Sequence, residues 1–148
     1  MKIIKISTDL ELTVHEYPEE KSYVQQNKVL CELIGNHCDI YECVEPKRLY
    51  TKLNMYNSPI TVAGRCVCML VDEEGLLKEN EPNLVASYLY ETDIHQNPIM
   101  GNVLFVGKKW VNDGIDFCGI EDSICQSLEN KLKNIVYKMK IAKEALGK

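Results

Sequence analysis

Two apolar segments within residues 65–110 constrain the fold more than any other part of the chain. Residues 66–71 (CVCMLV) are apolar at every position, which is typical of a strand buried on both faces at the centre of a sheet. Residues 99–110 form a second long strand, in which Val103, Phe105 and Gly107 share one face. Between them, residues 72–75 (DEEG) predict a tight turn with Gly75 in the left-handed conformation, and residues 82–90 predict a short helix.

The first third of the chain predicts two strands, a helix and a third strand. Residues 1–6 and 10–17 alternate apolar and polar side chains, with a turn at residues 7–9. A helix is expected over residues 23–34, with Ser22 as its N-cap and Gly35 as its C-cap. Residues 38–44 predict the next strand. Residues 47–64 form a candidate insertion, either a helical turn with Leu49, Leu53 and Met55 inward or a loop.

The C-terminal segment, residues 121–148, predicts a long helix. Its apolar residues are spaced as a heptad seam: Leu128, Leu132, Ile135, Met139, Ala142 and Leu146. Such a helix either docks along the sheet of its own chain or pairs with another subunit through its far end. Because a helix of about 26 residues spans about 39 Å at the standard rise, more than a small sheet covers, we expect a homo-oligomer.

Together these patterns predict the α+β class: a mostly antiparallel sheet with flanking helices and a long C-terminal helix. We expect a core domain over residues 1–120 and an oligomerisation element over residues 121–148. At 148 residues the chain is long enough to bury an ordinary hydrophobic core.

Composition excludes several classes of function. A net charge of −5 argues against stable nucleic-acid binding, which depends on neutralising phosphates. The sequence shows no secretory signal and no apolar run long enough to cross a membrane. Seven cysteines lie mostly inside apolar patterns, as expected for free thiols in a reducing cytoplasm. We therefore expect a cytoplasmic protein.

Patterns that signal catalysis or metal binding are weak. Glu73 and Glu74 lie in a turn where neighbouring side chains diverge, unlike the paired carboxylates of a glycosidase. The cysteines and histidines do not form the two spaced pairs typical of zinc sites. No glycine loop is placed to hold a phosphate. We expect no enzymatic activity, no metal and no cofactor.

The strongest ligand-like feature is the cluster Lys108-Lys109-Trp110. A tryptophan beside two cations can stack a base and neutralise a phosphate. Asn102 and Asn83 could add amide hydrogen bonds to a base edge, and Arg65 a further cation. Two structural alternatives stay open. For the cluster, the alternative is that Trp110 packs against the C-terminal helix and both lysines lie in solvent. For Asn83, the alternative is a helix N-cap without a ligand.

The middle of the chain resembles a small, uncharacterised domain family of Gram-positive bacteria, their phages and conjugative elements. The resemblance covers residues 1–120 and rests on residues 29–42, 72–77 (DEEGLL), 82–86 (PNLVA) and 99–107 (IMGNVLFVG). Two positions depart from the family pattern: Asp72 replaces an asparagine, and Asn36 replaces a glycine. The family brings no established activity, but the resemblance implies a mobile-element context.

From the ligand-like cluster and this context we expect a phage or mobile-element protein that sequesters a small cyclic nucleotide signal and so counters bacterial defence. The alternative is a protein inhibitor that binds a host defence effector through an acidic surface. That surface would consist of Glu73, Glu74, Glu79 and Glu81. A third option is a structural accessory domain without a small ligand.

Overall fold

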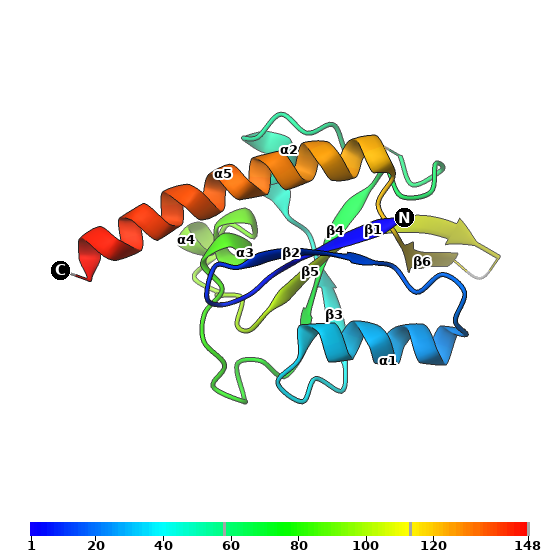
Figure 1. Ribbon diagram of the computed structural model, residues 1–148, viewed down its shortest axis with the longest axis horizontal. Helices are drawn as coiled ribbons and strands as arrows, with labels where there is room; N and C mark the ends of the chain where they lie inside the picture. Colours follow the sequence, from blue (N-terminus) through cyan, green and yellow to red (C-terminus); the bar gives the residue numbers. More distant parts are fainter. Residues whose placement is uncertain (58, 113, 148) are drawn as a thin grey trace.

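The computed structural model describes residues 1–57, 59–112 and 114–147 and contains one antiparallel sheet of six strands (Figure 1). Three positions within the predicted segments, Ser58, Asp113 and Lys148, lie outside the described residues. The strands are β1 (Lys2–Ile6), β2 (Leu12–Glu16), β3 (Tyr41–Val44), β4 (Val67–Asp72), β5 (Val103–Val111) and β6 (Gly114–Cys118). Their order is β2-β1-β5-β4-β3, and β6 also pairs with β5. The predicted α+β class, with a mostly antiparallel sheet, is confirmed.

Strand β5 organises the sheet because it pairs with three others. Its first residues, Val103 to Phe105, pair with β1, and its last residues, Gly107 to Val111, pair with β6. Its other edge pairs with β4. An isolated bridge between Lys2 and Ile120 joins the end of β6 to the start of β1.

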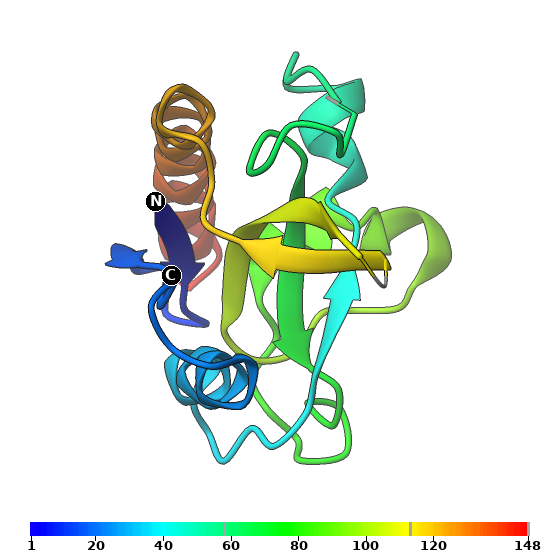
Figure 2. The same cartoon turned by 90° about the vertical axis from the view of Figure 1, so that its right-hand side faces the viewer.

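The sheet has helices on both faces. Helix α1 (Tyr23–Ile34) covers one face, which we call the α1 face. Helices α2 (Lys47–Thr51), α3 (Leu84–Leu89) and α5 (Asp122–Leu146) cover the other, which we call the α5 face. The short helix α4 (Thr92–His95) follows α3. The long α5 runs across β1 and β2 on the side of the sheet opposite α1 (Figures 1 and 2).

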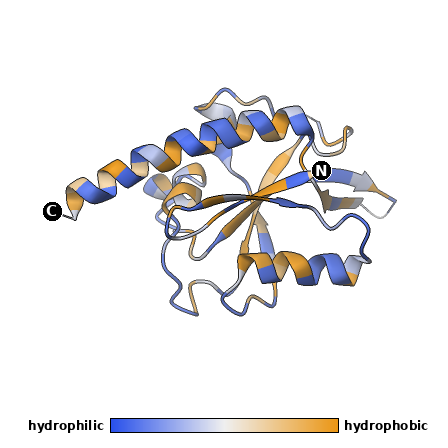
Figure 3. Ribbon diagram, viewed as in Figure 1, coloured by the Kyte–Doolittle hydropathy of each residue, from blue (hydrophilic) through white to orange (hydrophobic). Residues whose placement is uncertain are grey.

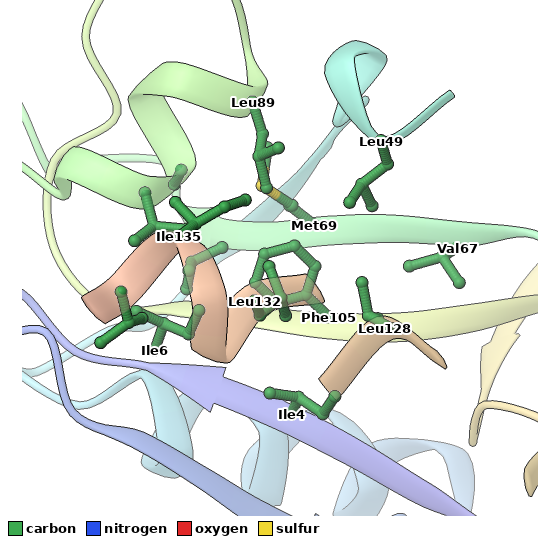
Figure 4. Packing of buried hydrophobic residues seen from close by; sticks show 14 of the residues in the cluster. Ile4, Ile6, Leu49, Val67, Met69, Leu89, Phe105, Leu128, Leu132 and Ile135 are labelled. Atoms are coloured by element: carbon green, nitrogen blue, oxygen red, sulfur yellow. The ribbon is translucent and has the colours of Figure 1, made fainter. Parts of the chain in front are cut away.

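Two buried clusters hold these layers together, one on each face. On the α5 face, Phe105, Met69 and Ile4 pack beneath Leu128 and Leu132 of α5 (Figure 4). On the α1 face, the cluster includes Ile3, Cys68, Leu70, Leu104, Val106, Leu30 and Ile34. Every residue of β4 is buried, which confirms its predicted central position. The central strands of the sheet are accordingly largely hydrophobic (Figure 3).

Local predictions were largely correct, with two corrections. Ser22 caps α1, its side chain accepting from the Gln25 amide at 3.3 Å, and Gly35 ends the helix with φ +76°. Leu10, predicted at the start of a strand, lies in the loop before β2 with φ +63° and is buried. Gly75 is not left-handed. A Cβ there would lie 2.8 Å from the Met100 carbonyl oxygen, so close backbone approach explains the glycine.

The sequence failed to predict two elements and left one open. Strand β6 is short and begins with glycine, so its alternation (GIDFC) is too brief to stand out. Helix α4 has four residues and buries none of them. Of the two alternatives for residues 47–64, the helical turn is correct. Leu49 and Met55 are buried in the α5-face cluster, and Leu53 packs against it.

Helix α5 extends beyond the sheet that it covers (Figure 1). Leu128, Leu132 and Ile135 of the predicted seam are buried, and Met139 packs at the edge of the core. Every described residue after Met139 is exposed, and Leu146 is 88% exposed. Half of the heptad seam therefore docks on the sheet. Within the described residues, no helix combines the length and apolar character needed to cross a membrane.

Candidate functional site

Strands β5 and β6 form a hairpin that carries the predicted cluster Lys108-Lys109-Trp110. Lys108 lies opposite Phe117, and Trp110 lies opposite Ile115. Side chains alternate along a strand, so Lys108 and Trp110 share the α1 face with Leu104 and Val106. Cross-strand partners point the same way. We call these four residues, Lys108, Trp110, Ile115 and Phe117, the hairpin face.

The hairpin curls over the sheet toward β3. The Phe117 ring contacts Tyr41 of β3 edge to face, with centroids 5.8 Å apart. The Tyr17 hydroxyl donates to the Phe117 carbonyl oxygen at 3.1 Å, and burial raises the pKa of Tyr17. These contacts anchor the base of the hairpin and fix the orientation of its face.

Trp110 is 57% exposed, and its partner Ile115 is 50% exposed. The alternative in which Trp110 packs against the C-terminal helix is wrong, because α5 covers the opposite face of the sheet. An indole this exposed is available to a ligand.

Lys109 points away from the hairpin face. It lines a cleft of about 270 Å³ together with Met1, Tyr17, Glu19, Gln26, Ala63 and Cys118. Within this cleft the N-terminal ammonium pairs with Glu19 at 3.0 Å. Alternation along β5 therefore separates the two lysines, which the sequence had grouped together.

The two predicted asparagines have structural roles at the other end of β5. Asn102 accepts from the Thr8 amide at 3.1 Å and donates to the Ile34 carbonyl at 2.8 Å. Asn83 is fully buried. It caps α3 and donates to two backbone carbonyls, which confirms the N-cap alternative. Asn102 is eight residues before Trp110, roughly 26 Å along an extended strand, and it cannot share a small ligand with it.

Arg65 lies beside the start of α5, where its Nε pairs with a Glu121 carboxylate oxygen at 3.5 Å. Its side chain is about half exposed. Of the six predicted ligand residues, the structure therefore brings only Lys108 and Trp110 together on one face.

Comparisons with protein-family models, with curated proteins and with solved structures find no match. The resemblance to the mobile-element domain family thus stays a prediction. The site must be interpreted from its own chemistry. Among the described residues, no group of three or more histidine, cysteine or acidic side chains is placed to hold a metal ion.

Three cysteines on the α1 face were not predicted as part of the site. Cys43 of β3 and Cys68 of β4 lie next to each other, and Cys66 precedes β4 opposite Lys108, whose amide donates to the Cys66 carbonyl at 3.0 Å. The signal was present in the alternation of residues 38–44 and 66–68. It was missed because strand pairing, which the sequence does not give, brings these residues together.

A second surface surrounds the predicted acidic turn. Asp72 is buried and pairs with Lys78 at 2.8 Å, while Glu73 and Glu74 are exposed. Leu76 and Leu77 follow with 67% and 84% exposure. Partial burial, together with repulsion from Glu73, raises the pKa of Glu42 nearby. This turn thus combines two exposed acidic side chains with two exposed leucines.

Proposed function

We propose that the protein binds a small nucleotide on the hairpin face and withdraws it from solution without changing it. The observation that carries this proposal is the exposed Trp110 on the same face as Lys108. An indole can stack on any base, and a lysine ammonium two positions away can neutralise a phosphate. Ile115 and Phe117 add apolar surface around the ring. The link to bacterial defence rests on the motif resemblance alone.

Trp110 is the only tryptophan of the chain, so its fluorescence reports on the hairpin face directly. We would titrate the protein with AMP, cyclic AMP, cyclic GMP and cyclic di-AMP. Saturable quenching by one of them is expected, and chromatography should recover that nucleotide intact.

Separate substitution of the two neighbouring lysines shows whether binding depends on the hairpin face. Lys108→Gln should weaken binding about tenfold or more, because it removes the only hairpin-face cation. Lys109→Gln is the matched control, since Lys109 points into the cleft behind the hairpin. Absence of quenching by all four nucleotides, or equal effects of the two substitutions, would contradict the proposal.

We also propose that the exposed end of α5 pairs with a second copy of the chain. Residues 131–148 carry six lysines and one glutamate, whereas residues 1–130 carry eleven basic and twenty-one acidic residues. The end of the helix is therefore complementary in charge to the body of another copy. Tyr137, Ile141 and Leu146, exposed by 65%, 50% and 88%, supply apolar contacts.

Light scattering tests this pairing. The full chain should be larger than a monomer at low salt and dissociate as salt screens the charges. A chain ending at Met139 keeps every buried residue of α5 and should be monomeric. A full chain that is monomeric at about 0.1 mM and low salt would rule the pairing out.

The acidic turn supports a second candidate function, inhibition of a protein partner. Leu76 and Leu77 are exposed beside Glu73 and Glu74, a combination that suits a basic surface with an apolar centre. Cross-linking in a bacterial lysate should then capture one partner. Leu77→Ser should abolish capture, whereas Trp110→Ala should not. The opposite pattern would assign the capture to the hairpin face.

A further inference from the structure

The pairing of β3 with β4 places two cysteine side chains next to each other. Cys43 lies opposite Leu70, and Cys68 precedes Leu70 by two positions on the same face. The two cysteines are therefore diagonal neighbours on adjacent antiparallel strands. Lys108 extends toward them from the hairpin face and attracts both thiolates.

The two cysteines differ in exposure. Cys43 is exposed on β3, which forms the edge of the sheet, whereas Cys68 is fully buried in the central β4. Solvent reagents can therefore reach Cys43, while Cys68 is shielded from solvent and neighbours Cys43. This arrangement suits an attacking thiol and a resolving thiol.

The surroundings also favour the thiolate of Cys43. A hydrogen bond with Cys68, together with the nearby Lys108 ammonium, lowers the pKa of Cys43 to about 7 despite partial burial. The same hydrogen bond and burial raise the pKa of Cys68 well above its ordinary value. At neutral pH, Cys43 is thus substantially ionised and Cys68 carries the proton.

We propose that Cys43 and Cys68 form a redox-active thiol pair that reacts with hydrogen peroxide. The Cys43 thiolate attacks one peroxide oxygen, so that an S–O bond forms, the O–O bond breaks, and hydroxide leaves and takes up a proton to become water. Cys43 is then a sulfenic acid. Cys68 attacks the Cys43 sulfur, the S–O bond breaks, and the hydroxyl group leaves with the Cys68 proton as a second water. Two thiols and one peroxide thus give one disulfide and two waters.

The strand geometry predicts a strained disulfide. Diagonal neighbours in a sheet have Cα atoms about 7–8 Å apart, at or beyond the upper limit for a disulfide. Closure therefore requires β3 to shift toward β4, which is feasible because β3 has four residues and only one strand neighbour. Strained disulfides are readily reduced, so the reaction should be reversible with a monothiol reductant.

The chain contains its own control pair, Cys31 and Cys38, whose thiols donate to the carbonyl oxygens of Asp39 and Ile40, each at 3.6 Å. Burial raises the pKa of both, that of Cys38 to about 12, so neither ionises at neutral pH. We therefore expect Cys43 to react at neutral pH and expect Cys31 and Cys38 not to.

Alkylation by iodoacetamide, followed by peptide mass spectrometry across pH, tests whether the Cys43 thiol is accessible and ionised at neutral pH. It requires no nucleotide. Cys43 should be modified first, with a midpoint near pH 7, and Lys108→Gln should raise that midpoint. Cys31→Ser should leave it unchanged. A Cys43 midpoint near 9, the ordinary value for a cysteine, would overturn the proposal.

Treatment with stoichiometric hydrogen peroxide tests the oxidation of Cys43 and the formation of the disulfide. The wild-type chain should yield a Cys43–Cys68 disulfide. Cys68→Ser should stop at a Cys43 sulfenic acid that dimedone traps, and Cys43→Ser should yield neither product. A disulfide between Cys31 and Cys38 instead, or no oxidation at Cys43, would refute the pair.

Discussion

Asn83 shows how one buried side chain joins three parts of the chain. Its oxygen caps α3 at the Ala86 amide, and its nitrogen donates to the carbonyls of Ile6 and Gly101, each at 3.0 Å. Those carbonyls belong to the end of β1 and the approach to β5. An asparagine is required because the position needs an acceptor and two donors at once.

Asn83→Ala should therefore lower the free energy of unfolding by about 3 kcal/mol, from the lost cap and two buried carbonyls left without donors. Urea unfolding measures the change. Asn134→Ala, at an exposed position of α5, should change stability by less than about 0.5 kcal/mol. Similar effects of the two substitutions would show that the Asn83 contacts are not needed.

Asp93 makes stability depend on pH. Its carboxylate accepts two hydrogen bonds from the buried Arg48, at 2.6 and 2.8 Å, and this pairing lowers the pKa of Asp93 below 3.8. A carboxyl whose pKa is lower in the folded state stabilises the fold above its unfolded pKa. That contribution is lost as pH falls through the folded pKa.

Wild type should consequently be more stable than Asp93→Asn at pH 5–7, and the difference should vanish as pH falls below 3.8. Urea midpoints at several pH values measure this, with Asp9→Asn at an exposed loop position as control. A difference that persists unchanged at pH 2.5 would exclude the ion pair as its source.

Helix α5 combines two environments within one element. Leu132 is fully buried against the sheet, whereas Leu146 is 88% exposed. Leu132→Ala should cost about 2–5 kcal/mol of unfolding free energy, as expected for a leucine removed from a packed core. Leu146→Ala should cost less than about 0.5 kcal/mol when the monomer is measured by urea unfolding at low protein concentration. Equal costs would mean that the end of α5 is packed in solution.

Elements with many apolar residues in a regular pattern could be predicted from the sequence, and short ones could not. Strand β4 was predicted because residues 66–71 are all apolar, and the structure buries the whole strand. Strand β6 was not, because it depends on its neighbour β5 rather than on its own pattern. Gly75 was correctly placed in a turn, but the contact that requires it comes from Met100, a distant residue.

At the scale of the whole molecule, the candidate site could be predicted only in part. Lys108, Lys109 and Trp110 are consecutive in sequence, but strand alternation separates Lys109 from the other two. Asn83 and Asn102 are used by backbone groups far from the hairpin. Conversely, Cys43 and Cys68 are twenty-five positions apart and meet only because β3 pairs with β4. Their proximity depends on the pairing register of β3 and β4, which local sequence patterns do not specify.

The pairing of β1 with β5 also sets the timing of folding during synthesis. Ile4 pairs with Phe105, so β1 leaves the ribosome roughly a hundred residues before its partner strand. At about 5–20 residues per second this delay lasts roughly 5–20 s. Throughout it, Ile4 and Ile6, which are completely buried in the finished protein, lack Phe105 of β5 and the α5 side chains that cover them. The nascent chain should therefore be most prone to aggregation, and most dependent on chaperones, until residue 105 has emerged.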